Sequence, residues 1–191
     1  MRRIVLALCA GFVLLALWAL RAHAGGSQEA VERGAYLVSI GSCNDCHTPW
    51  TLTDKGPAPD FSRLLSGHPE GMRLPPPPAM APGPWGFIGA LSMTAWAGPW
   101  GVSFTSNLTP DPETGIGAWS EDTFIRALRT GKHLGGGRDI LPPMPWEWVG
   151  KMTDEDLKAV FAYLKSIKPI RNRVPDPLPP APPAAAAKSA S

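Results

Sequence analysis

Apolar residues recur at helical spacing in three stretches of the chain, which predicts three helices. The first stretch covers residues 28–40 and leads directly into a pair of cysteines. The second begins after Ser120, a residue type that caps helices well, and stops near Gly131. The third follows Thr153, which opens a sequence resembling a capping box, and Pro169 ends it.

The segment 49–118 follows no such pattern. It holds 13 prolines, four of them in succession at positions 75–78, and no regular period continues along it. We therefore expect mostly ordered loop. Loops this long are uncommon in compact domains unless they serve a function, and wrapping a large apolar cofactor is one such function. Trp85, Trp96 and Trp100 are then expected to shield the cofactor from water, and an exposed docking patch for a partner protein is the alternative.

The N-terminus has the composition of an export signal. Two arginines precede an apolar stretch at residues 4–20, and the small-residue site Ala22-His23-Ala24 follows. Cleavage after Ala24 removes residues 1–24 and leaves a periplasmic protein. An uncleaved membrane anchor is the alternative, because the apolar stretch is only slightly short for a spanning helix.

A single domain is predicted over residues 25–170, followed by a disordered tail at 171–191 that is rich in proline and alanine. The whole chain has 18 basic and 16 acidic side chains, but three of the arginines belong to the signal, so the processed protein has 15 and 16. No basic block or interleaved aromatic stripe remains in it. We therefore expect no nucleic-acid partner.

The strongest chemical signal is the run Cys43-Asn44-Asp45-Cys46-His47. A C-x-x-C-H run is typical of covalent haem attachment. Two cysteines three residues apart on a helical turn project to the same side and can bond two haem vinyl groups, while His47 ligates the iron. One such run predicts one haem c.

Three other interpretations of the cysteines are weaker. A disulfide between Cys43 and Cys46 closes so short a loop that it adds little stability, and it leaves His47 unexplained. A thioredoxin-like redox pair needs a preceding strand and a βαβ pattern, which the sequence does not show. A zinc site needs a fourth ligand, and no second cysteine pair supplies one.

The second axial ligand of the iron has several candidates, of which we favour Met144. It lies in Leu141-Pro142-Pro143-Met144-Pro145-Trp146, where the prolines restrict the backbone and can hold the thioether against the iron. The remaining candidates are Met72, Met80, Met93, Met152, His68 and His133. A methionine–histidine pair fills both axial positions, which favours electron transfer over catalysis.

The chain resembles class I-like c-type cytochromes, and within them the bacterial periplasmic branch related to the cytochrome c subunits of membrane-bound dehydrogenases. The matching motifs follow one order over residues 29–170: Arg33 to Val38, Cys43 to Pro49, Asn107 to Ser120, Arg129 to Gly131, Pro142 to Trp146, and Met152 to Leu157. The chain departs from those subunits in having one C-x-x-C-H run, since they carry several.

This resemblance implies an all-α, cytochrome c-like domain around the haem. It implies that the first and last helices cross where Gly34 lets Tyr163 or Phe161 approach. It also implies that Trp119 either faces a haem propionate or packs before the second helix. For the carbonyl that orients His47, we propose the Gly56-Pro57 segment.

The sequence thus predicts a periplasmic one-electron carrier between redox partner proteins, without substrate chemistry of its own. One alternative is a haem-bearing subunit fixed in a larger oxidoreductase. Another is a haem enzyme or sensor whose sixth ligand is labile. Membrane association through the N-terminus remains open.

Overall fold

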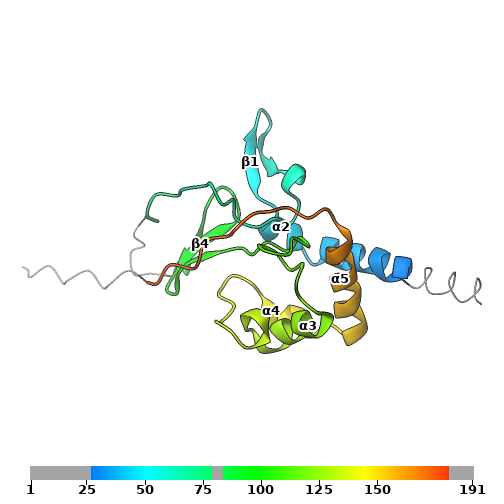
Figure 1. The fold of residues 1–191 in the computed structure, drawn as a ribbon. Coiled ribbons are helices and arrows are strands. Elements are labelled where there is room, and N and C mark those ends of the chain that lie inside the picture. The colour runs from blue at the N-terminus through cyan, green and yellow to red at the C-terminus, as the bar shows by residue number, and fades with distance from the viewer. Residues whose placement is uncertain (1–26, 79–83, 181–191) are drawn as a thin grey trace, which may run out of the picture.

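The computed structural model describes residues 27–78 and 84–180, and it combines helices with antiparallel sheets (Figure 1). The expectation of an all-α domain is therefore wrong. After an N-terminal helix at residues 27–40, the elements are α2 (Cys43–His47), β1 (Trp50–Thr53), β2 (Gly56–Pro59), η1 (Phe61–Arg63), β3 (Ile88–Gly89), β4 (Ala95–Gly98), β5 (Gly101–Phe104), α3 (Glu121–Thr130), η2 (His133–Gly135), α4 (Trp146–Val149) and α5 (Asp154–Ser166).

The predicted helices are all present, and the predicted caps hold two of them. The Ser120 hydroxyl accepts a hydrogen bond from the backbone of Thr123 at the start of α3, and Gly131 ends that helix in the left-handed region. At α5, Thr153 caps the backbone of Asp156 in the same way. These contacts satisfy amide groups that the first turn of a helix leaves without partners.

The N-terminal helix crosses α5 at Gly34, as the resemblance implies. A Cβ atom at this position would lie 1.9 Å from the backbone oxygen of Ala159 and 2.8 Å from the Cβ of Tyr163. Glycine therefore allows the two backbones to touch. Tyr163 is the expected neighbour, and Ala159 takes the place proposed for Phe161.

Two small antiparallel sheets lie within the segment expected to be loop. Strands β1 and β2 form a hairpin, and β3, β4 and β5 form a three-stranded sheet in that order. These strands are hard to recognise from the sequence. The buried positions of β5 are Gly101 and Ser103, and β2 contains two prolines. Neither strand therefore shows the alternation of large apolar and polar residues by which strands are recognised.

The hydrophobic core joins the N-terminal helix, α3 and α5. Its buried members include Leu37 and Val38 from the first of these helices and Phe124 from the second. Leu157 and Leu164 of α5 are 0% and 2% exposed and complete the contact. The core therefore lies beside the C-x-x-C-H run, which directly follows the N-terminal helix.

The segment after α5 is ordered, in contrast to the tail expected from residue 171. Residues 170–178, here called the strap, run from α5 back across the molecule to the sheet of β4 (Figure 1, orange to red). Leu178 pairs with Val102 of β5 through two backbone hydrogen bonds of 2.9 Å. The rest of the expected tail, 181–191, lies outside the described residues.

The predicted export signal, residues 1–24, also lies outside the described residues. Among residues 27–78 and 84–180, no helix combines the length and apolar composition that crossing a membrane requires.

Candidate functional site

The helix is interrupted at residues 41 and 42, which separates the C-x-x-C-H run from the N-terminal helix. The amide of Gly41 donates to the carbonyl of Leu37, and Ser42 then adopts a left-handed backbone with φ 54°. Helix α2 starts at the next residue and contains the whole run from Cys43 to His47. Both thiols and the imidazole are therefore carried by one short helix, as predicted.

His47 is buried, and a backbone carbonyl fixes its ring. Its Nδ1–H donates to the carbonyl oxygen of Ser106 at 2.8 Å. Burial lowers the pKa of His47, which favours the neutral imidazole that metals bind. Since Nδ1 is engaged, Nε2 is the nitrogen available to a metal ion.

The carbonyl proposed from the sequence is the wrong one. Gly56 and Pro57 instead begin β2 and pair with Thr53 and Leu52 in the hairpin. A peptide carbonyl is present in every residue, so the sequence carries no mark that singles out Ser106. Its position beside His47 follows from the path of the segment after β5.

The two thiols are free and partly buried. Desolvation raises the pKa of Cys43 to about 11, and the pKa of Cys46 is also raised, chiefly by burial and then by the nearby Asp45 carboxylate. Redox-active cysteine pairs need a lowered thiol pKa, so this environment is the opposite of a thioredoxin-like site. Among the residues the structure describes, no cluster of three or more His, Cys, Asp or Glu side chains could hold a metal ion.

Met144 is half-buried and packs against the core. The Ser103 hydroxyl of β5 donates to the carbonyl of Pro142 at 2.6 Å, and the amide of Trp146 donates to the carbonyl of Met144 at 2.9 Å. The prolines, β5 and α4 thus fix the backbone on both sides of this thioether. Its role as iron ligand stays a prediction.

The other methionines are in different surroundings. Met152 packs against the core just before α5, while Met72 and Met93 are partly buried in the segment between η1 and β4. Met80 lies outside the described residues. Among the methionines that the structure describes, Met152 alone shares the contact of Met144 with the core, which makes it a suitable control in experiments.

The two candidate histidines have protein partners. His68 is 1% exposed, its Nδ1 is hydrogen-bonded to the Thr94 hydroxyl at 3.0 Å, and its ring lies 4.7 Å from that of Phe104. The ring of His133 lies edge-on to Trp119 at 5.3 Å. Burial lowers the pKa of both histidines. The Nε2 of His68 is buried without a hydrogen-bond partner in the described protein, so its contacts engage only one of its two ring nitrogens.

The tryptophans of the proline-rich segment have no single role. Trp85 is 82% exposed, and its role beside a cofactor stays a prediction. Trp96 and Trp100 lie close to Phe87, with ring centroids about 6 Å apart, and so pack within the three-stranded sheet. Trp119 packs against the core, which agrees with the packing alternative for that residue.

The sequence did not reveal the backbone segments that pack against His47. The amide of Gly67 donates to the carbonyl of His47 at 2.8 Å, and the amide of His68 donates to the carbonyl of Thr105 at 3.0 Å. The segments 66–68 and 104–106 therefore lie together behind α2. No local pattern in the sequence identifies such backbone contacts.

Comparison with known proteins gives a consistent group of relatives, although no family model matches the chain. A nicotinate dehydrogenase component of Pseudomonas putida is 32% identical over 149 residues, which cover 78% of this chain and 10% of that protein. The cytochrome c subunit of the quinone alcohol dehydrogenase of Gluconobacter oxydans is 29% identical over 173 residues, 88% of this chain and 29% of that subunit. The gluconate 2-dehydrogenase cytochrome c subunit of Pantoea cypripedii is 32% identical over 133 residues, 70% of this chain and 22% of that subunit.

The similarity covers most of this chain and a small part of each relative. The chain spans less than a third of the length of these three proteins. Two of the three are described as cytochrome c subunits of a dehydrogenase, and a fructose dehydrogenase cytochrome subunit of Gluconobacter japonicus is also similar, at 26% identity. The relatives therefore agree with the resemblance inferred from the motifs.

Proposed function

Because the chain is a homologue of the cytochrome c subunits of bacterial dehydrogenases, we propose that it carries haem c and transfers electrons one at a time. The observation that carries this proposal is the fixed ring of His47. A buried imidazole whose Nδ1–H is held by a carbonyl presents Nε2 to a metal in one orientation. No residue of the described protein takes that nitrogen as a hydrogen-bond partner.

The described residues fit a covalently attached haem. Cys43 and Cys46 are free thiols on the same helical turn as His47, so they can form the two thioether bonds to the vinyl groups. His47 and Met144 supply the two axial ligands in this proposal. The bound iron would cycle between ferric and ferrous states, with a potential set by its ligands and by burial.

The finer parts of the proposal follow from the sequence. One C-x-x-C-H run supports one haem, whereas related subunits of this kind often carry more. The N-terminal composition supports export to the periplasm with removal of residues 1–24. With both axial positions filled by protein, the chain would relay electrons between redox partners and would not transform a substrate.

A second candidate is a haem-bearing subunit held in a larger oxidoreductase. The names of the relatives favour it, because all those described above are subunits of dehydrogenases. The two candidates differ in the size of the native particle. A carrier is expected to be released from cells as a single chain, while a subunit is expected to co-purify with a dehydrogenase in stable proportion.

Expression in a host with haem-attachment machinery tests the central claim. We expect the exported protein to be coloured and heavier than its polypeptide by the mass of one haem. The double variant Cys43→Ser, Cys46→Ser is expected to lose the covalent mass. A colourless wild-type protein with the mass of the polypeptide alone would refute the proposal.

The sixth ligand is tested by Met144→Ala, with Met152→Ala as a matched control. We expect Met144→Ala to open one axial position, so that the reduced protein binds carbon monoxide rapidly at neutral pH. Met152→Ala and wild type are expected to bind it slowly. Equal, slow binding by all three proteins would exclude Met144 as the ligand, whereas rapid binding by wild type would favour a sensor or enzyme with a labile ligand.

A further inference from the structure

Asn172 of the strap is 1% exposed, and its side-chain amide is fully used. Its Nδ2 donates to the carbonyls of Ser66 at 2.7 Å and His68 at 2.9 Å. Its Oδ1 accepts from the amide of Glu70 at 2.8 Å and from the guanidinium of Arg63 at 3.0 Å. A buried amide with four partners specifies one arrangement of the segments that it joins.

The two carbonyls bound by Asn172 flank Gly67, which contacts the haem-binding run directly. The Gly67 amide donates to the carbonyl of His47 at 2.8 Å. A Cβ at Gly67 would lie 2.4 Å from the carbonyl oxygen of Thr105 and 2.6 Å from the carbonyl carbon of Ser106. Asn172 thus holds the backbone that packs against both His47 and the carbonyl that orients its ring.

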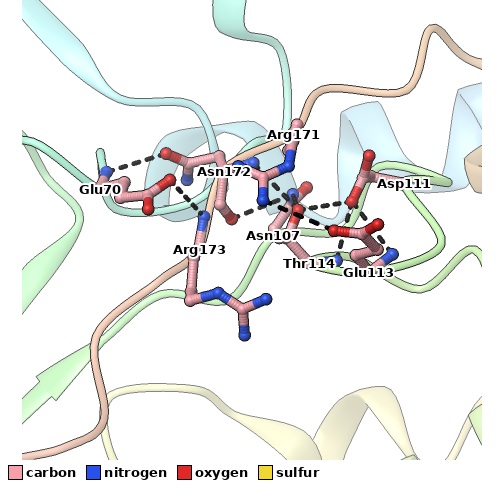
Figure 2. Close-up of polar contacts among 8 residues, drawn as sticks. All are labelled: Glu70, Asn107, Asp111, Glu113, Thr114, Arg171, Asn172 and Arg173. Carbon is pink, nitrogen blue, oxygen red and sulfur yellow. Dashed lines mark hydrogen bonds and ion pairs between the residues drawn. The ribbon is translucent and has the colours of Figure 1, made fainter.

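A second asparagine ties the same carbonyl to the strap from the other side. Asn107 follows Ser106 directly, and its Nδ2 donates to the strap carbonyls of Ile170 at 2.8 Å and Asn172 at 3.3 Å. Figure 2 shows Asn107 and Asn172 side by side, with Thr114 bridging them. The strap therefore restrains Ser106 through its next residue as well as through Gly67.

We propose that Asn172 is a positioning residue for His47. It acts through Gly67 and Ser106, so that the strap keeps the imidazole ring in the orientation that iron ligation requires. This proposal rests on the proposed function above. None of the four hydrogen bonds of the Asn172 side chain goes to His47, so its effect passes through the backbone segments 66–68 and 105–107. Loss of its two N–H donors leaves two buried carbonyls without partners and loosens the Ser106 carbonyl from the ring.

Asn172→Asp is the direct perturbation, since it keeps the shape and the acceptor oxygen but replaces the donors with a carboxylate facing two carbonyls. The measured quantity is the solvent exchange rate of the His47 Nδ1 proton, followed by nitrogen NMR of the histidine-labelled ferrous haem protein. Exchange requires the bond to Ser106 to open. We expect it to be faster by about tenfold or more, the factor that corresponds to ~1.4 kcal/mol.

Arg171→Ala is the matched control within the strap. Arg171 pairs with Glu113 at 3.5 Å, and both side chains are about two-thirds exposed, so the pair contributes little. In this variant we expect the exchange rate of the His47 Nδ1 proton to remain within about twofold of wild type. Backbone amides of α3, remote from the strap contacts, report global opening in every sample.

The outcomes separate the positioning role from simple stabilisation. Faster exchange at His47 with unchanged exchange in α3 supports the proposal, while an equal rise at both sites, or no change at His47, overturns it. If Asn172→Asp yields no folded haem protein, Asn172→Ala removes the same donors without adding a buried charge and is expected to accelerate exchange at His47 while leaving α3 unchanged. A wild-type protein without haem refutes the proposed function itself, so the two failures are distinguishable.

Discussion

The contact at Gly34 makes a sharp prediction for Gly34→Ala. The new methyl group would lie 1.9 Å from the Ala159 oxygen and 2.6 Å from the Ala159 carbonyl carbon, whereas ordinary contact begins at 3.4 Å. Both atoms belong to the α5 backbone, so no side-chain rotation relieves the clash. The N-terminal helix and α5 must therefore move apart by more than an ångström.

The expected loss of stability follows from the hydrophobic side chains that the two helices bury where they cross. Leu37 and Val38 pack with Leu157 and Leu164 in one buried cluster, and each such side chain contributes about 2 kcal/mol by burial. A gap of 0.5–1 Å, smaller than the shift required at Gly34, already forfeits roughly a quarter to a half of the contact energy, so the loss over these four side chains is at least about 2 kcal/mol. Gly34→Ala should therefore reduce the free energy of unfolding by about 2–4 kcal/mol, although alanine favours helix by about 0.5–1 kcal/mol.

Denaturant unfolding followed by circular dichroism measures this difference, with Gly71→Ala as the control. No atom lies within 4 Å of a Cβ at Gly71, so this variant should be within about 0.5 kcal/mol of wild type. If Gly34→Ala proved as stable as Gly71→Ala, the close crossing of the two helices would be refuted. A gain in stability would show that helix propensity outweighs packing there.

Three further predictions concern the segments around the site. Thr153→Ala removes the cap of α5 and should cost about 1 kcal/mol in denaturant unfolding, so an unchanged midpoint would contradict the cap's contribution. The Asp111 carboxylate accepts hydrogen bonds from the hydroxyl and amide of Thr114, which hold its pKa below the ordinary 3.8. The ionised carboxylate therefore stabilises the folded protein above pH 3.8, and this stabilisation is lost as the pH falls through the lower pKa of the folded state. In thermal melts at several pH values, Asp111→Asn should lose less stability on the acid side than wild type. Identical pH profiles of the two proteins would contradict this contribution of Asp111. Ser103→Ala removes the bond to the Pro142 carbonyl, so the reduced haem protein should bind carbon monoxide faster, and a wild-type rate would show that this bond does not restrain Met144.

The helix at residues 27–40, α3 and α5 could be predicted from the sequence because their signals are local, whereas the short helices η1, η2 and α4 were not predicted. Ser120 and Thr153 are capping residue types in the right place, and α5 carries apolar residues at helical spacing. The strands could not be predicted, because β5 buries Gly101 and Ser103 and so has no apolar face to detect. The stability of that sheet comes from backbone pairing and from neighbours that lie far away in the chain.

The same distinction applies to the site. Two cysteines and His47 lie within five consecutive positions of the sequence, so a motif identifies them and predicts their chemistry. The group that orients His47 is a backbone carbonyl 59 residues away. Asn172 falls in a predicted disordered tail because proline and alanine dominate the residues that follow it. Its four side-chain hydrogen bonds depend on segments that no local pattern brings together.

The strap also has a consequence for the order in which the protein folds. Asn172 meets Ser66 across 106 positions of the chain, and contacts between such distant segments form late because the intervening loop must first close. If the protein is exported N-terminus first, as proposed, the cysteine run emerges well before the strap, whose residues contact the segments packed against α2. An enzyme that attaches haem would then find Cys43 and Cys46 accessible for an interval, which would end when the strap docks.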